Sequence, residues 1–139
     1  MDENKYYTLK GYKIKNNSSI TEAMEDYLEM IYRNSLKNKS IRIKDISVKL
    51  NVKPSSVSKM INKLKELGLV NFHKYGQITM TSLGIKKGSY LLYRHNILKR
   101  FFKLLNKDNY KLEQVEKIEH FIDPITIKNI NDLIKNHDI

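Results

Sequence analysis

The pattern of apolar and polar positions predicts a mainly helical chain. After Thr21, a good N-cap, an apolar side chain recurs every three or four residues, which predicts a first helix that reaches about Leu36. The apolar stripe of this helix consists of Met24, Leu28, Ile31 and Tyr32. A second, shorter helix is marked by Ile43, Ile46 and Leu50. Residues 1–19 show no clear period and are assigned to an N-terminal arm, either loosely packed or lying on a phosphate backbone or a partner subunit.

A two-faced helix and a β-hairpin follow. Pro54 fits the first helical position, so the helix is predicted from Pro54 to about Leu67, with Gly68 directly after its end. Its apolar face carries Val57, Met60, Ile61, Leu64 and Leu67, and its other face carries Ser55, Ser56, Lys59, Asn62 and Lys63. Two strands are predicted at residues 69–73 and 77–80, joined at Lys74, Tyr75 and Gly76. This order of elements predicts a winged helix-turn-helix DNA-binding domain over residues 20–82.

The remainder of the chain, residues 83–139, is predicted to be a second, helical domain. Thr81 or Ser82 caps a long helix that continues to about Leu105. Two shorter helices are predicted from Lys111 to Ile122 and from Ile125 to about Lys135, separated by Asp123 and Pro124. The predicted fold class is therefore mainly α, with a winged helix-turn-helix of three helices plus a β-hairpin wing preceding the helical domain.

Charge is distributed unevenly along the chain. The formal net charge is +11, and residues 37–74 hold ten Lys or Arg against two acids, whereas residues 20–32 hold four acids and no Lys or Arg. A basic module of this kind predicts a polyanionic partner, here double-stranded DNA. Short polar side chains and lysines on one helix face suit the approach to base edges and phosphates. The candidate DNA-binding residues are Lys53, Pro54, Ser55, Ser56, Lys59, Lys63, His73 and Lys74.

Composition restricts the remaining possibilities. With 139 residues and 40% hydrophobic content, the chain can form one medium domain or two very small ones. There is no Cys, so disulfides and thiolate zinc sites are excluded, and any metal must be held by oxygen and imidazole ligands. No apolar run has membrane-spanning length and the first residues lack the apolar centre of a signal peptide, so we expect a cytoplasmic protein.

An acidic cluster near the C-terminus suggests a cation. Glu116, Glu119 and His120 have the spacing i, i+3 and i+4, which places them on one face of a helix. Glu119 falls among the apolar residues Leu112, Val115 and Ile122. An ionised carboxylate in such surroundings costs several kcal/mol unless a cation offsets it. No Lys or Arg of this helix shares the face, so either a remote basic side chain or a metal ion supplies the charge, and a metal is favoured.

Three further residues extend this cluster to other helices. Asp26 and Glu29 lie one turn apart on the first helix, and His95 lies on the apolar face of the long helix. Taken singly, the acid pair is explained by a solvated face and His95 by a hydrogen-bonded core position. Taken together with the acidic cluster, the six residues would repel one another when the helices pack, and one or two divalent cations would remove that repulsion. His73 and His137 are interpreted as surface residues and not as ligands.

Four motifs, in order and at the expected separations, resemble a known family. Residues 24–29 (MEDYLE), 53–60 (KPSSVSKM), 93–95 (YRH) and 115–120 (VEKIEH) are similar to the diphtheria-toxin-repressor-like family, and most to its manganese transport regulator branch. The resemblance implies that Asp26, Glu29, His95, Glu116, Glu119 and His120 are metal ligands, in a site that can be binuclear. Iron-responsive members tend to have Met at the position of Asp26, whereas the manganese branch has Asp.

The resemblance also implies a function, and it makes residues 83–139 the helical metal-binding and dimerisation domain. It predicts a homodimeric repressor that binds operator DNA and controls manganese uptake genes when Mn²⁺ is plentiful, and no enzymatic activity. Ligand type alone would also admit Fe²⁺, Co²⁺ or Zn²⁺. An iron-responsive repressor of the same family and a metal-independent winged-helix regulator, with its acids paired to Arg94 or lysines, remain as alternatives. A dimetal enzyme is disfavoured because such bundles usually carry Glu-x-x-His on two helices.

Overall fold

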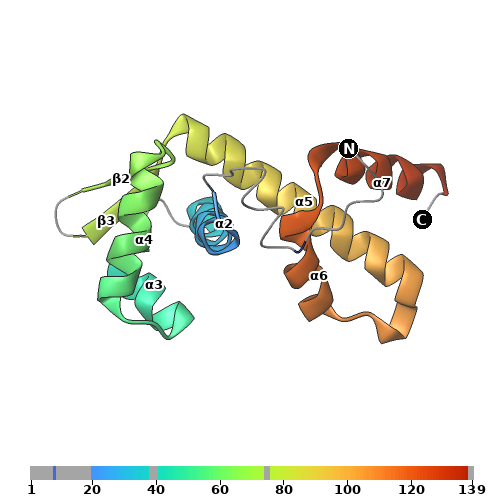
Figure 1. The fold of residues 1–139 in the computed structure, drawn as a ribbon, viewed down its shortest axis with the longest axis horizontal. Coiled ribbons are helices and arrows are strands. Elements are labelled where there is room, and N and C mark those ends of the chain that lie inside the picture. Colours follow the sequence, from blue (N-terminus) through green and yellow to red (C-terminus); the bar gives the residue numbers. More distant parts are fainter. Residues whose placement is uncertain (1–7, 9–19, 38–40, 74–75, 138–139) are drawn as a thin grey trace.

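The computed structural model describes residue 8 and residues 20–37, 41–73 and 76–137. Within these residues the protein contains six α-helices and a three-stranded sheet, which confirms the mainly helical class (Figure 1). The α-helices are α2 (Glu22–Lys37), α3 (Ile43–Leu50), α4 (Pro54–Glu66), α5 (Ser82–Asn106), α6 (Leu112–Ile118) and α7 (Pro124–Asn136). The strands are β1 (Ile41–Arg42), β2 (Val70–Phe72) and β3 (Gln77–Met80), and short 3-10 helices are η2 (Lys107–Asn109) and η3 (Glu119–Phe121). No helix in these ranges is long and apolar enough to cross a membrane.

The N-terminal unit consists of α2, α3, α4 and the sheet, as expected for a winged helix-turn-helix. Strand β3 lies in the centre, pairing antiparallel with β2 from Val70 to Phe72 and with β1 at Ile41 and Arg42. The predicted hairpin is therefore confirmed, and β1 is an addition, because a strand of two residues has no alternation that a sequence pattern can show. Its core contains Leu28, Ile31, Ile46, Val57, Ile61, Leu64, Val70 and Ile78, each at most 2% exposed.

Helix α5 connects the N-terminal unit to the rest of the chain without a break (Figure 1). The Thr81 hydroxyl accepts a hydrogen bond from the backbone N–H of Gly84 at 3.0 Å, which confirms the predicted N-cap. Gly88 is buried where α5 meets α2, and a Cβ there would lie 2.7 Å from Cβ of Tyr32. Gly88 therefore allows α2 and α5 to pack closely, and this contact positions the α2 acids beside α5.

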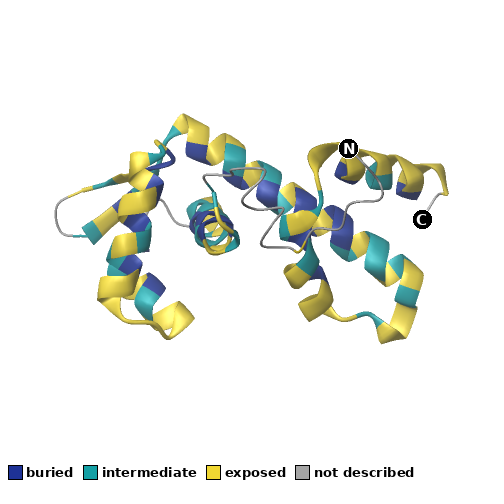
Figure 2. Cartoon of the chain, in the orientation of Figure 1, coloured by how far each residue is buried: buried dark blue, intermediate teal, exposed yellow. Residues whose placement is uncertain are grey.

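The C-terminal unit packs around the second half of α5. Its core consists of Ile97, Leu98, Val115, Ile127 and Ile134. Figure 2 shows that buried positions are concentrated in the middle of α5, where Leu91 belongs to one core and Leu98 to the other. A single helix thus contributes to both cores, and His95 lies on it between them.

One predicted helix is shorter than expected. The stretch from Lys111 to Ile122 forms α6 only as far as Ile118 and then tightens into η3. Leu112 is also exposed, so Glu119 is not surrounded by the apolar stripe that a continuous helix would have given it. The physical reason lies just downstream. Asp123 precedes Pro124 and is extended so that its carboxylate accepts a hydrogen bond from the N–H of Thr126, so the preceding helix has to end.

Candidate metal centre

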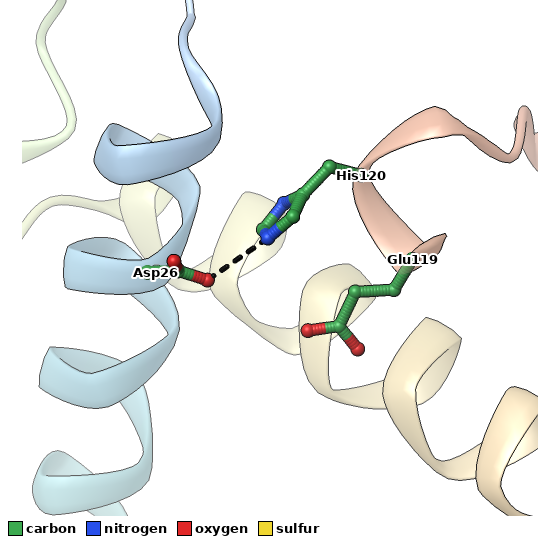
Figure 3. Close-up of side chains that lie close together, drawn as sticks. All are labelled: Asp26, Glu119 and His120. Carbon is green, nitrogen blue, oxygen red and sulfur yellow. Dashed lines mark ion pairs between the residues drawn. The ribbon is translucent and has the colours of Figure 1, made fainter. Parts of the chain in front are cut away.

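Three segments bring the candidate ligands together. Helix α2 supplies Asp26 and Glu29, α5 supplies His95, and α6 with η3 supplies the remaining three. Asp26, Glu29, His95, Glu116 and Glu119 line one cavity, which also reaches Arg33, Lys37 and Lys49. Figure 3 shows Asp26 facing His120 across from α2, with Glu119 projecting toward the same space. The packing of α2 and η3 against α5 therefore assembles groups that are up to 94 positions apart in the sequence.

The ligand atoms form two triads that share one carboxylate. Asp26, Glu119 and His120 offer ligand atoms that all lie within 4.8 Å of one another, and Glu29, His95 and Glu119 do the same. We call these the outer triad (Asp26, Glu119, His120) and the inner triad (Glu29, His95, Glu119). Each offers two carboxylates and one imidazole, a set that suits a divalent first-row cation. A carboxylate common to both can bridge two ions.

Glu119 is the most constrained member. Glu119 is 3% exposed, and its Oε2 lies 2.9 Å from Nδ1 of His95, which is also buried. Burial of this carboxylate was expected. In the described part of the chain no Lys or Arg pairs with Glu119; its ion-pair partner is an imidazole. The sequence left two sources of positive charge open, a remote basic side chain and a metal ion. Among the described residues, no Lys or Arg takes this role beside Glu119.

His120 lies between two carboxylates. Its Nε2 is 3.1 Å from Asp26 and its Nδ1 is 3.0 Å from Glu25. The hydrogen bonds to Asp26 and Glu25 favour the protonated imidazolium and raise the pKa of His120 from 6.5 to about 10, against the opposing effect of burial. In this arrangement the proton on Nε2 points toward Asp26, and a metal ion in the outer triad would have to replace it.

Glu25 is an important residue that the sequence reasoning did not assign to the site. Besides His120, it contacts Arg94 at 3.2 Å and Lys87 at 3.7 Å, both on α5. Burial opposes its ionisation, but the hydrogen bond from His120 and the charge of Arg94 outweigh burial and lower the pKa of Glu25. A carboxylate that bonds the second nitrogen of a candidate ligand histidine would fix the tautomer and orientation of its ring. The only sequence signal was the spacing of Glu25 to Leu28, which places it toward α5.

Glu29 has a different neighbour. Its Oε2 lies 2.5 Å from Nη2 of Arg33, one turn along α2. Burial and the nearby Glu119 carboxylate raise the pKa of Glu29, and Arg33 opposes this rise. The sequence reasoning also missed Arg33, although its i+4 spacing from Glu29 was visible.

Glu116 is placed less closely than the other candidates. It borders the cavity but is exposed, and among the described residues it belongs to neither triad. Its role as a ligand stays a prediction. His137 is exposed and bonds its own helix, with Nδ1 3.0 Å from the carbonyl of Leu133.

The candidate DNA-contacting residues form an exposed row on α4. Lys53 is its N-cap residue, and the buried face of the helix consists of Val57, Ile61 and Leu64. The exposed residues are Lys53, Pro54, Ser55, Ser56, Lys59 and Lys63. On the wing, His73 is exposed and its Nε2 lies 3.2 Å from the Thr79 hydroxyl, whereas Lys74 lies outside the described residues.

Comparison with known proteins gives consistent results. Residues 19–78 match the family model described as iron dependent repressor, N-terminal DNA binding domain. The HTH-type transcriptional regulator MntR of Bacillus subtilis (strain 168) is 39% identical over 116 residues, which is 83% of this chain and 82% of that protein.

Solved structures agree in fold. The manganese regulator SloR superposes with a TM-score of 0.67 at 28% identity, and ScaR with bound Zn²⁺ with a TM-score of 0.69 at 27% identity. Each match covers 81% of this chain and 53% of the other. The chain thus spans about half the length of these two solved structures.

Proposed function

Since this chain belongs to the diphtheria-toxin-repressor-like family of metal-dependent transcriptional repressors, we propose that it is a Mn²⁺-responsive repressor. It binds operator DNA as a homodimer and controls manganese uptake genes. The family consists of transcriptional repressors and not of enzymes. A regulator of this kind acts on the chromosome, so we place it in the cytoplasm.

The observation that carries this proposal is the shared, buried carboxylate of Glu119. Two triads drawn from α2, α5 and η3 meet at this residue, so an ion bound there connects the DNA-binding unit to the C-terminal unit. The proposed ligands are Asp26, Glu29, His95, Glu116, Glu119 and His120, in a binuclear site. When bound, the ion supplies the positive charge that balances these carboxylates.

Manganese is favoured by the chemistry of the donor set. Oxygen and imidazole ligands without any thiolate suit Mn²⁺, and the chain has no Cys to offer. MntR and SloR, the latter named a manganese regulator, support this choice, whereas ScaR with bound Zn²⁺ shows that a relative also takes zinc. Affinity rises along the first-row series, so selection depends on geometry and on metal supply.

The proposed mechanism is linkage between metal and DNA. Asp26 and Glu29 belong to α2 of the DNA-binding unit, whereas Glu119 and His120 belong to η3. Residues from both units that hold one ion fix the orientation of α4, the recognition helix. If the ion binds the DNA-competent orientation more tightly, metal raises the affinity for DNA, and DNA raises the affinity for metal by the same factor. This coupling is typically about 1–3 kcal/mol.

The proposed DNA interface is the exposed row on α4 together with the wing. Ser55, Ser56 and Lys59 approach base edges in the major groove, where short side chains and a lysine can reach donors and acceptors. Lys53, Lys63, His73 and Lys74 contact phosphates, and Pro54 sets the start of the helix.

Dimerisation is supported by apolar side chains that the C-terminal unit leaves exposed. Leu105, Phe121, Ile125 and Leu133 are between 46% and 71% exposed. Exposed apolar side chains of this size are candidates for burial between subunits, and a dimer would present two recognition helices to a palindromic operator.

The test is selection of binding sites from random DNA duplexes with Mn²⁺ and, in parallel, with a chelator. We expect a two-fold symmetric sequence to be enriched only when Mn²⁺ is present. Equal enrichment with chelator would instead favour a metal-independent regulator. A parallel anaerobic selection with Fe²⁺ distinguishes the iron-responsive alternative, which corresponds to the wording of the family model's description.

A further inference from the structure

The two triads differ in the permanent charge beside them. Glu29 of the inner triad is paired with the Arg33 guanidinium at 2.5 Å, whereas the described contacts of the outer-triad residue Asp26 include only the imidazole of His120. The Arg33 guanidinium keeps its positive charge, because arginine is not deprotonated in proteins. Because the guanidinium holds Oε2 of Glu29, a cation that enters the inner triad competes with Arg33 for the negative charge of this carboxylate.

Arg33 is positioned so that its separation from Glu29 is possible. The two residues are four apart on α2, so helix geometry keeps the guanidinium within reach of Glu29. The Arg33 side chain is 43% exposed and that of Glu29 only 14%, so Arg33 lies at the mouth of the cavity and can turn into solvent. The carboxylate stays inside while its partner is free to leave.

We propose that Arg33 is a resident competitor for Glu29, so that the outer triad takes the first metal ion and the inner triad takes a second ion more weakly. This inference rests on the proposed function, because it assumes that both triads bind Mn²⁺. Arg33 then acts as a specificity-determining residue that sets the Mn²⁺ concentration at which the site fills completely.

The chain offers a matched control for this idea. Lys37 lies one turn beyond Arg33 on α2 and lines the same cavity. In the described ranges no ion pair joins Lys37 to Glu29. Removing either residue's charge lowers the net charge by the same one unit, but only Arg33 contacts a candidate ligand directly.

The experiment compares wild type, Arg33→Met, Lys37→Met and Arg33→Lys. Calorimetric titration with Mn²⁺ gives stepwise affinities, and the paramagnetic resonance signal of unbound Mn²⁺ gives stoichiometry. We expect Arg33→Met to tighten the weaker step by about fivefold, the factor that a partly exposed ion pair supplies, and to leave the tighter step within about twofold. Lys37→Met and Arg33→Lys are expected to leave both steps within about twofold.

The outcomes separate this inference from the proposed function. If Arg33→Met and Lys37→Met shift the weaker step equally, the effect is general charge and the inference is wrong. If wild type and Arg33→Met bind two ions with identical constants, or one ion each with the same constant, the inference also fails while metal binding stands. If no variant binds Mn²⁺, the proposed function itself fails.

Discussion

Replacing Glu119 by Gln tests whether the buried carboxylate is a metal ligand or half of a structural ion pair. Glu119→Gln keeps the size of the side chain and its hydrogen-bonding capacity toward Nδ1 of His95, 2.9 Å away. It removes one negative charge that raises the pKa of Glu29. The metal-free variant should therefore unfold at the wild-type temperature or slightly higher.

The magnitude for the metal-bound protein follows from mass action. At a free Mn²⁺ concentration of 100 times Kd, binding stabilises the folded state by about 2.7 kcal/mol. For a chain of this size this corresponds to a rise in Tm of roughly 10 °C. Because Glu119 belongs to both triads, Glu119→Gln should weaken Mn²⁺ binding by at least about 100-fold, the upper range found for residues that only support a ligand. At the same Mn²⁺ concentration the variant should gain less than about 1 kcal/mol.

The assay is thermal unfolding with Mn²⁺ or with chelator. Glu113→Gln is the matched control, because it removes the same charge from α6 at a side chain that is 79% exposed and lies in neither triad. It should show the wild-type Mn²⁺ response. If the Glu119–His95 contact were instead a structural ion pair, Glu119→Gln would cost about 3–5 kcal/mol without metal. That loss, or a wild-type Mn²⁺ response in Glu119→Gln, would refute the ligand assignment.

Three further predictions concern other parts of the molecule. Lys59→Ala should weaken operator binding by about 1–3 kcal/mol in gel-shift titrations while Mn²⁺ affinity without DNA stays unchanged, and an equal loss of metal affinity would contradict the separation of the two units. Glu116→Ala should retain the fold, since Glu116 is exposed, but lose the Mn²⁺ response of DNA binding; an unaltered Mn²⁺ titration would remove it from the ligand set. Because the pKa of His120 is raised to about 10, its contribution to metal-free stability is fully present below pH 6.5 and is lost as the pH rises through 10. Mn²⁺ must displace this proton, so affinity should rise with pH, and calorimetry in buffers of different ionisation enthalpy at pH 7.5 should show about one proton released at the outer triad. Absence of proton release would exclude His120 as a ligand.

Elements with a clear local signal were predictable from sequence. The bounds of α4 follow from Pro54 at its start and from Gly68, whose φ of +75° suits glycine, just after its end. The burial of Glu119 was also predicted, but its cause differs, because the structure buries this carboxylate against His95 of α5 and not within an apolar stripe of its own helix. Helix α5 also begins directly after its predicted cap, because the hydroxyl of Thr81 accepts its hydrogen bond from a backbone N–H only three residues away.

Features that depend on how helices cross were not predictable. Glu25 was visible only as an acid near the start of a helix, and its partners Arg94 and His120 lie 69 and 95 positions away. A continuous helix would have kept Glu116, Glu119 and His120 on one face. The 3-10 turn that begins at Glu119 changes the directions of Glu119 and His120 relative to Glu116. This is why Glu116 lies at the edge of the cavity and outside both triads.

The unbroken course of α5 through both cores means that the two units are not joined by a flexible hinge. From His95 back to Ser82 the helix extends for about 20 Å at 1.5 Å per residue. A bend of only about 5° at His95 would move its far end, and the DNA-binding unit attached there, by nearly 2 Å, enough to break a base contact with a reach near 3 Å. In the proposed mechanism α5 is therefore a lever, through which a small rearrangement of the proposed ligands near His95 would move α4 by a larger distance.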